Sequence, residues 1–223
     1  MRLRSCACWA VDNPPPSYGG RYFILLRLEA EGGLVGWGEI YGVPFHPRVV
    51  AAMVEDVFEA ELRGEPACDL ERLFRIVRGR NYSARPDPTL YAVWSGLEIA
   101  LLDLAGRAAG LPVWALLGGR AHSRLRAYTY IYPAAGQGEE VYEDPEAGAA
   151  RARAYVQQGW TALKFDPVPP YSVFDPREPS SAELAHGERY VRAVREAVGE
   201  AADLLIGTHG QFTVSGAVRF ARR

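Results

Sequence analysis

Three side chains that could move protons or bind an anion stand at the ends of two short apolar segments. The segment WTALKFD carries Lys164 and ends at Asp166, and DLLIGTHG brings His209 close behind a second apolar run. An ammonium, a carboxylate and an imidazole are groups that can act as general acid or base. If both segments are neighbouring parallel strands, the three side chains meet at one edge of the sheet.

Alternation decides which side chains of these segments share a face, because successive residues of a strand point to opposite sides. We expect the two inward-facing sets to be Ala162, Lys164 and Asp166, and Leu205, Gly207 and His209. The intervening apolar residues would then face covering helices. This arrangement places the three chemical groups side by side.

Each of these features also has a purely structural interpretation, and the sequence leaves both open. Lys164 and Asp166 could form a structural ion pair, and His209 could be a hydrogen-bonded residue without catalytic work. The tyrosine stripe around Tyr130 could be core packing or substrate lining. The proline-rich loop 166–181 could face a substrate or be a rigid surface connection.

The second half of the chain alternates strands with helices. Strands are predicted at Leu125–Tyr132, Trp160–Asp166 and Asp203–Thr208. Helix starts are indicated by Asp144-Pro145-Glu146, by the capping box Ser180-x-x-Glu183 and by Thr213. Three successive strand–helix units predict a parallel sheet with right-handed crossovers.

The first half reads differently, with strands first and helices after. Strands are predicted at 2–11, 21–30 and 34–41, the last two as a hairpin, and helices at 48–62, 69–80 and 88–109. Asp69 is a plausible N-cap, Gly110 should stop the long helix, and Pro112 should prevent its resumption. This order predicts a segregated α+β domain over residues 1–120. Residues 121–223 would then form either a small doubly wound sheet or a barrel cut short, and we favour the barrel because an open three-stranded parallel sheet would leave its edges unsealed.

Bulk properties exclude several partners. The 223 residues are 48% hydrophobic with a net charge of -2, which gives no reason to expect nucleic acid or an anionic membrane as partner. We see no signal peptide and no apolar run near the roughly 20 residues that span a bilayer. Three cysteines without C-x-x-C spacing fit a reduced, cytoplasmic protein.

Three stretches together resemble the enolase superfamily, in its mandelate racemase and muconate-lactonizing branch. They are LVGWGEIYG, the run from Ser95 to Gly119 ending in LLGG, and GWTALKFDPVPPY, which is similar to the second-strand motif of sugar-acid dehydratases. The resemblance implies an α+β capping domain followed by the first three βα units of a TIM-type (β/α)7β barrel, incomplete at the C-terminus.

The resemblance also implies a reaction: removal of the proton alpha to a carboxylate, an enediolate held by Mg²⁺, and loss of the β-hydroxyl as water. Lys164 would lie near the substrate carboxylate, and His209 would assist departure of the hydroxyl. Asp166 and Tyr130, with Tyr41 and His46 of the capping loops 15–20 and 41–46, would bind substrate.

The chain departs from this pattern at several positions. Gly207 stands where related dehydratases carry an acidic metal ligand, and Gln211 stands where an arginine is common. Asp166 replaces the second lysine of the racemases' K-x-K, which weakens a two-base racemase. The further ligands would lie on later strands, so the metal ligands are unknown and Mg²⁺ binding by this chain is not expected.

Three hypotheses follow. The leading one is a sugar-acid (aldonate) dehydratase or its N-terminal portion, inactive as this chain. The second is a non-catalytic fragment or pseudoenzyme that acts as a binding or assembly module. The third is a racemase or cycloisomerase of the same family. The expected partner is a small sugar acid, and a full-length version would form a homo-oligomer.

Overall fold

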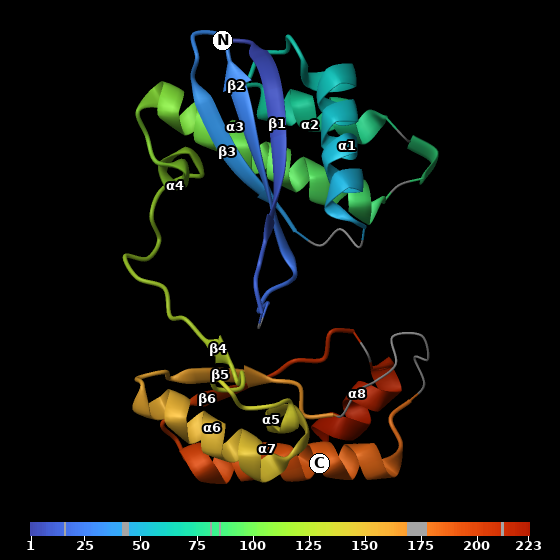
Figure 1. The fold of residues 1–223 in the computed structure, drawn as a ribbon, viewed down its shortest axis with the longest axis vertical. Coiled ribbons are helices and arrows are strands. Elements are labelled where there is room, and N and C mark those ends of the chain that lie inside the picture. Colours follow the sequence, from blue (N-terminus) through green and yellow to red (C-terminus); the bar gives the residue numbers. More distant parts are fainter. Residues whose placement is uncertain (16, 42–44, 81, 85, 169–177, 211) are drawn as a thin grey trace. The chain divides into compact units, whose positions relative to one another are not determined.

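The computed structural model describes residues 1–15, 17–41, 45–80, 82–84, 86–168, 178–210 and 212–223. They form two compact units, Met1–Ser123 and Arg124–Arg223 (Figure 1). Each unit has a three-stranded sheet and a hydrophobic core of its own.

Unit 1 begins with an antiparallel sheet in the order β1-β2-β3, formed by Leu3–Asp12, Tyr22–Ala30 and Val35–Ile40. The predicted hairpin is confirmed. Gly32 and Gly33 supply its turn with φ of 85° and 78°, a left-handed conformation that glycine adopts at little cost. Alternate residues of β2 are buried against the helices, as its alternating pattern requires: Ile24, Leu26, Leu28 and Ala30.

The helices of unit 1 lie close to their predicted positions. They are α1 (Pro47–Val57), which continues as the π-helical turn η1 (Phe58–Leu62), α2 (Leu70–Gly79), the 3-10 turn η2 (Tyr82–Ala84), α3 (Pro88–Ala109) and α4 (Val113–Leu116). Asp69 is the N-cap residue of α2 as predicted, although its side chain makes no capping hydrogen bond. Gly110 ends α3 in the left-handed conformation as expected, and Pro112 is the N-cap of the one-turn α4, so a new helical turn does follow it.

The long helix α3 lies directly on β3. An ideal β-carbon built on Gly36 would stand 2.1 Å from the carbonyl oxygen of Ala100, and one on Gly38 would stand 2.1 Å from that of Gly96. The helix and the strand therefore touch backbone to backbone. By length and composition α3 could also cross a membrane, but the buried core helix of a globular domain passes the same test.

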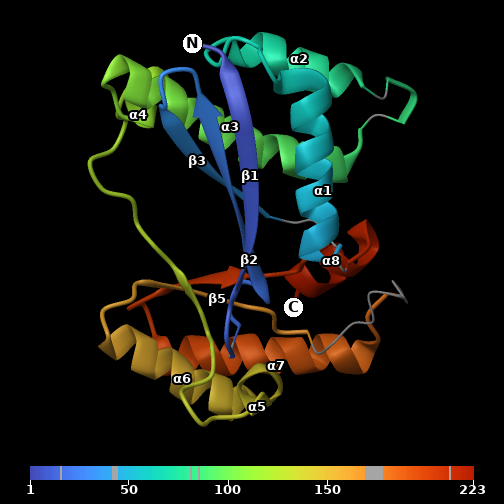
Figure 2. The same cartoon turned by 45° about the horizontal axis from the view of Figure 1, so that its top comes forward.

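Unit 2 is the predicted parallel sheet, in the order β4-β5-β6, formed by Thr129–Tyr130, Ala162–Phe165 and Asp203–Ile206. Its helices are α5 (Glu140–Glu143), α6 (Pro145–Gln157), α7 (Ser181–Val198) and α8 (Val214–Ala221). The Ser180–Glu183 capping box and the Asp144 and Thr213 caps are confirmed. Helices α6 and α7 run side by side along one face of the sheet (Figure 2).

The predicted first strand of unit 2 is much shorter than expected. Only Thr129 and Tyr130 are strand, instead of residues 125–132. The guanidinium of Arg126 donates to the Thr161 carbonyl, the Thr161 hydroxyl and the Asp203 carboxylate. The Arg126 side chain thus bonds to β5 and β6 at the place where a longer β4 would have paired with β5 through its backbone.

Candidate functional site

The candidate site lies where β5 and β6 end. Lys164 pairs with Leu205 in the parallel ladder, and the Gly207 N–H continues it by donating to the Phe165 carbonyl over 2.8 Å. Leu163 and Phe165 are buried in the core that includes α6 and α7. Alternation then places Lys164 and Asp166 on the opposite face, beside Gly207, which agrees with the predicted strand faces.

Lys164 lies among tyrosine rings. Its ammonium nitrogen is 5.1 Å from the ring centroid of Tyr130 and 5.6 Å from that of Tyr128, both within cation–π range. Burial acts to lower the pKa of Lys164, but contact with Tyr130, Tyr128 and Asp166 outweighs it and raises the net pKa. Lys164 is therefore a cation at neutral pH and suits an anion better than a proton transfer.

His209 faces the carboxylate of Asp166. Its Nδ1 lies 3.3 Å from Asp166 Oδ1, and the two side chains are 58% and 36% exposed. The imidazole also stacks on Tyr130, with ring centroids 6.4 Å apart and planes inclined by 26°. The backbone of His209 has a φ of 45°, a conformation that costs free energy for any residue except glycine.

Gly207 leaves open the space that these groups fill. A β-carbon at this position would stand 2.0 Å from Asp166 Oδ1 and 2.9 Å from the Tyr130 hydroxyl oxygen. Both oxygens are buried; Asp166 Oδ1 has no hydrogen-bond partner among the described residues, whereas the Tyr130 hydroxyl interacts with Lys164. Burial raises the pKa of the Tyr130 hydroxyl, and the negative charge of Asp166 adds to the effect.

Two other predicted substrate contacts belong to unit 1. Tyr41 is 79% exposed. His46 begins α1, where its Nδ1 accepts from the Arg48 N–H over 3.2 Å and its ring lies 6.2 Å from that of Tyr22. His46 thus has a capping role, and substrate binding by Tyr41 and His46 stays a prediction. Most of the loop 166–181, the middle of the loop 41–46, and Gln211 lie outside the described residues.

The described residues do not fit a magnesium site. Among them, no group of three histidine, cysteine, aspartate or glutamate side chains could hold a metal ion. The site offers Asp166 as a carboxylate, with the cationic Lys164 nearby, whereas Mg²⁺ prefers several oxygen ligands in octahedral array. No catalytic step through a metal can be built from these residues.

We therefore expect no stoichiometric binding of Mg²⁺ by this 223-residue chain. Calorimetric titration with MgCl₂ at millimolar concentrations should give no saturable heat above that of buffer dilution. Titration of the Asp166→Ala variant is the control, because any weak heat that survives this substitution does not come from the site. Tight, one-to-one binding lost in Asp166→Ala would contradict our account of Gly207.

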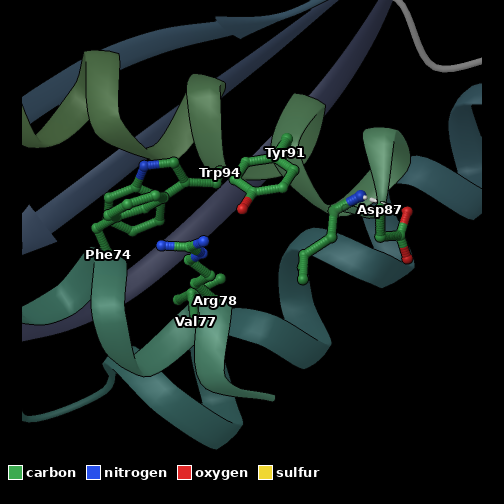
Figure 3. A pocket seen from close by; sticks show the side chains of 7 residues that line it. Phe74, Val77, Arg78, Asp87, Tyr91 and Trp94 are labelled. Atoms are coloured by element: carbon green, nitrogen blue, oxygen red, sulfur yellow. Dashed lines mark hydrogen bonds between the residues drawn. The ribbon is translucent and has the colours of Figure 1, made fainter. Parts of the chain in front are cut away.

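Two hollows elsewhere are poorer candidates. The pocket between α2 and α3 has a volume of about 10 Å³, which is room for a single water molecule, and Asp87 at its rim already caps α3 (Figure 3). A groove of about 560 Å³ between α7 and α8 is lined by apolar residues such as Ile206 and Phe220 together with the charged Glu188, Arg192, Arg195 and Arg223. By alternation Ile206 lies on the face of β6 opposite to Gly207, so this groove is separate from the candidate site.

One sequence signal for this site was overlooked. The chain has 25 lysine and arginine residues together, and Lys164 is the single lysine among them. An ammonium and a guanidinium are interchangeable at most exposed positions but not where a compact, strongly hydrated charge is needed. A lone lysine in an arginine-rich chain therefore points to this position.

Comparisons with known proteins agree on both units. A family model for the mandelate racemase/muconate lactonizing enzyme N-terminal domain matches residues 16–118. A model described as the enolase C-terminal domain-like family matches residues 147–223.

Curated relatives include a D-gluconate dehydratase of Thermoproteus tenax, 33% identical over 91% of this chain and 38% of its own length. A D-xylonate dehydratase of Haloferax volcanii is 31% identical over 91% of this chain and 48% of its own length. The chain thus spans half or less of the length of these two relatives.

Solved structures show the same fold. The mandelate racemase/muconate lactonizing enzyme of Jannaschia sp. CCS1 is 41% identical, with a TM-score of 0.92 over 100% of this chain and 58% of that one. A mandelate racemase/muconate lactonizing enzyme-like protein of Roseovarius sp. TM1035 is 41% identical, with a TM-score of 0.93 over 99% of this chain and 56% of that one.

Proposed function

Because this chain belongs to the mandelate racemase/muconate lactonizing enzyme branch of the enolase superfamily, we propose that its second unit carries part of the active site of a sugar-acid dehydratase. The names of its relatives, which are gluconate, galactonate and xylonate dehydratases, support this reaction class. The observation that carries the proposal is the meeting of Lys164, Asp166 and His209 at the ends of β5 and β6.

The reaction needs two proton transfers. A base removes the proton alpha to the substrate carboxylate, and an acid protonates the β-hydroxyl, which leaves as water. The electron pair of the broken C–H bond forms the new C=C bond, and the resulting enol becomes a 2-keto acid by tautomerisation. The family resemblance implies that Mg²⁺ stabilises the charge on the carboxylate, but the described residues of this chain do not supply its ligands.

Lys164 would hold the substrate carboxylate. Burial acts to lower its pKa, but contact with Tyr130, Tyr128 and Asp166 raises the net pKa and favours the cationic form, which attracts an anion and is poorly suited to accept the alpha proton. The alpha proton must then go to a base that we do not assign. The position two residues later, Asp166, is a carboxylate in place of a second lysine, which favours a dehydratase over a two-base racemase.

His209 would act as the general acid. Its Nδ1 faces Asp166, so Nε2 of the protonated, cationic ring would deliver a proton to the departing hydroxyl and leave the neutral ring with its proton on Nδ1. A positioned acid of this kind contributes about 10²–10⁴-fold to a rate. Because these groups are present while the described residues supply no metal site, we expect the 223 residues alone to bind a sugar acid without dehydrating it.

The single lysine makes the proposal testable by carbon-13 NMR. Reductive methylation with ¹³C-formaldehyde labels Lys164 and the terminal amine, and gluconate or galactonate should shift the Lys164 signal in a saturable manner. Lys164→Met should weaken binding measured by calorimetry about 10–100-fold, the loss of one charge-assisted contact. Lys164→Arg, which keeps the charge, should lose less.

A keto-acid assay on the same samples separates the three hypotheses. Binding without product supports the proposal, and product formed by the 223-residue chain would contradict the expected inactivity. An unchanged Lys164 signal up to high millimolar sugar acid would favour the non-catalytic module instead. Inversion at the alpha carbon, which would give the epimeric sugar acid, would favour the racemase.

A further inference from the structure

We propose that Asp166 is the positioning residue of the His209 imidazole, and that position 207 is glycine because Asp166 fills the space of a side chain there. The carboxylate at this edge of the sheet thus follows β5 instead of β6, and it orients a histidine instead of binding a metal ion. The proposal concerns contacts within unit 2, and it rests on the proposed function only for what His209 does to a substrate.

The space above Gly207 cannot hold both the Asp166 carboxylate and a side chain at position 207. An ideal β-carbon would stand 2.0 Å from Asp166 Oδ1, far inside the contact distance of two non-bonded atoms. The backbone does not need glycine at 207, because its φ lies outside the left-handed region, unlike that of Gly210 at 72°. The need for glycine at 207 is therefore one of space, and Asp166 creates it.

The Asp166 Oδ1 atom lies next to the imidazole ring of His209. It is buried without a hydrogen-bond partner among the described residues, and Nδ1 of His209 lies 3.3 Å away, close but not aligned as a hydrogen bond. A buried acceptor without a partner is costly, and a small rotation of the ring would satisfy it. Catalytic hydrogen bonds are often long in an enzyme without substrate and tighten when substrate binds.

Three charged or polar side chains surround His209, and each has a different contact. The Tyr130 ring from β4 stacks on the imidazole and fixes its plane. Asp166 from β5 faces Nδ1 and so sets which nitrogen is turned toward the site. Lys164 lies over the Tyr130 ring at 5.1 Å, on the same edge of the sheet. The unfavourable φ of 45° at His209 is consistent with a ring held by its surroundings.

The tautomer of the neutral His209 ring tests the proposal without substrate or metal. Two-bond ¹H–¹⁵N spectra of histidine-labelled protein distinguish a proton on Nδ1 from one on Nε2, and His209→Asn assigns the signal. We expect the wild-type ring to carry its proton on Nδ1, facing Asp166. Asp166→Ala, which only creates space, should return His209 to the Nε2–H form that an unpaired imidazole prefers.

Gly207→Ala supplies the reciprocal test, because its new methyl group should push the Asp166 carboxylate away and produce the same tautomer change. The melting temperature should stay within about 5 °C of the wild type, since the clash is with the end of a side chain. Asp166→Asn, which keeps an acceptor, should retain much of the wild-type signal. Gly79→Ala, with no atom within 4 Å of the new carbon, should change nothing.

Two results would overturn the proposal. One is an Nδ1–H signal that survives both Asp166→Ala and Gly207→Ala, since His209 would then be oriented by something else. The other is a Gly207→Asp protein that keeps Asp166 in place and binds Mg²⁺ stoichiometrically, since position 207 would then have room for a ligand. Neither result depends on sugar-acid binding, so failure of the proposed function would be recognised separately.

Discussion

His209→Asn is expected to lower the rate of sugar-acid dehydration by about 10²–10⁴-fold, the usual contribution of one general acid. The assay requires residues 1–223 joined to the further length that the relatives carry, because this chain alone is not expected to turn over. The product is measured as a 2-keto acid. Substrate affinity should change little, since the carboxylate is held by Lys164 and the loss falls on the transition state.

Asparagine is the right replacement for this position. It tolerates a positive φ better than most residues, so the backbone at 45° should survive the substitution. The matched control is His122→Asn at an exposed histidine of unit 1, which should leave the rate unchanged. An undiminished rate in His209→Asn would remove His209 from the mechanism.

Gly38→Ala is expected to destabilise unit 1 strongly, because the added carbon meets the backbone of α3. The added carbon would stand 2.1 Å from the Gly96 carbonyl oxygen and 3.1 Å from the Ala100 nitrogen, and both belong to the backbone of α3. A helix backbone cannot give way as a side chain can, so α3 must lift from the sheet. Overpacking of this kind should cost about 3 kcal/mol or more.

Thermal and urea unfolding followed by circular dichroism measure this loss. The melting temperature of unit 1 should fall by more than about 10 °C, given the size of the domain. Gly79→Ala is again the matched control, because it adds the same methyl group in the same unit with open space around it. A Gly38→Ala protein as stable as Gly79→Ala would mean that α3 and β3 do not touch as described.

The sequence predicted most of the fold because its local signals are strong. The strand β2, the cap at Asp144, the stop at Gly110 and the Ser180–Glu183 box each satisfy a local physical need, and the structure has them where expected. The length of β4 could not be predicted. It depends on Arg126 reaching Thr161 and Asp203, a contact between residues far apart in the chain.

For the candidate site, the sequence could predict which residues lie near one another but not how their side chains contact. Alternation and parallel pairing placed Lys164, Asp166 and Gly207 on one face, because both rules act through the backbone. The clash between Asp166 and a side chain at 207, and the positive φ of His209, depend on rotamers and on the turn after β6. Such details arise from packing, which no spacing of residue types reveals.

The solitary lysine gives the candidate site a consequence for proteolysis. A lysine-specific protease can cut this polypeptide at one peptide bond, between Lys164 and Phe165, within the central strand of the parallel sheet. That bond reaches a protease only when the sheet opens, so the rate of cleavage follows the equilibrium between closed and open forms. A bound sugar acid that contacts Lys164 would lower the open population, and resistance to digestion would report ligand binding with the unlabelled protein.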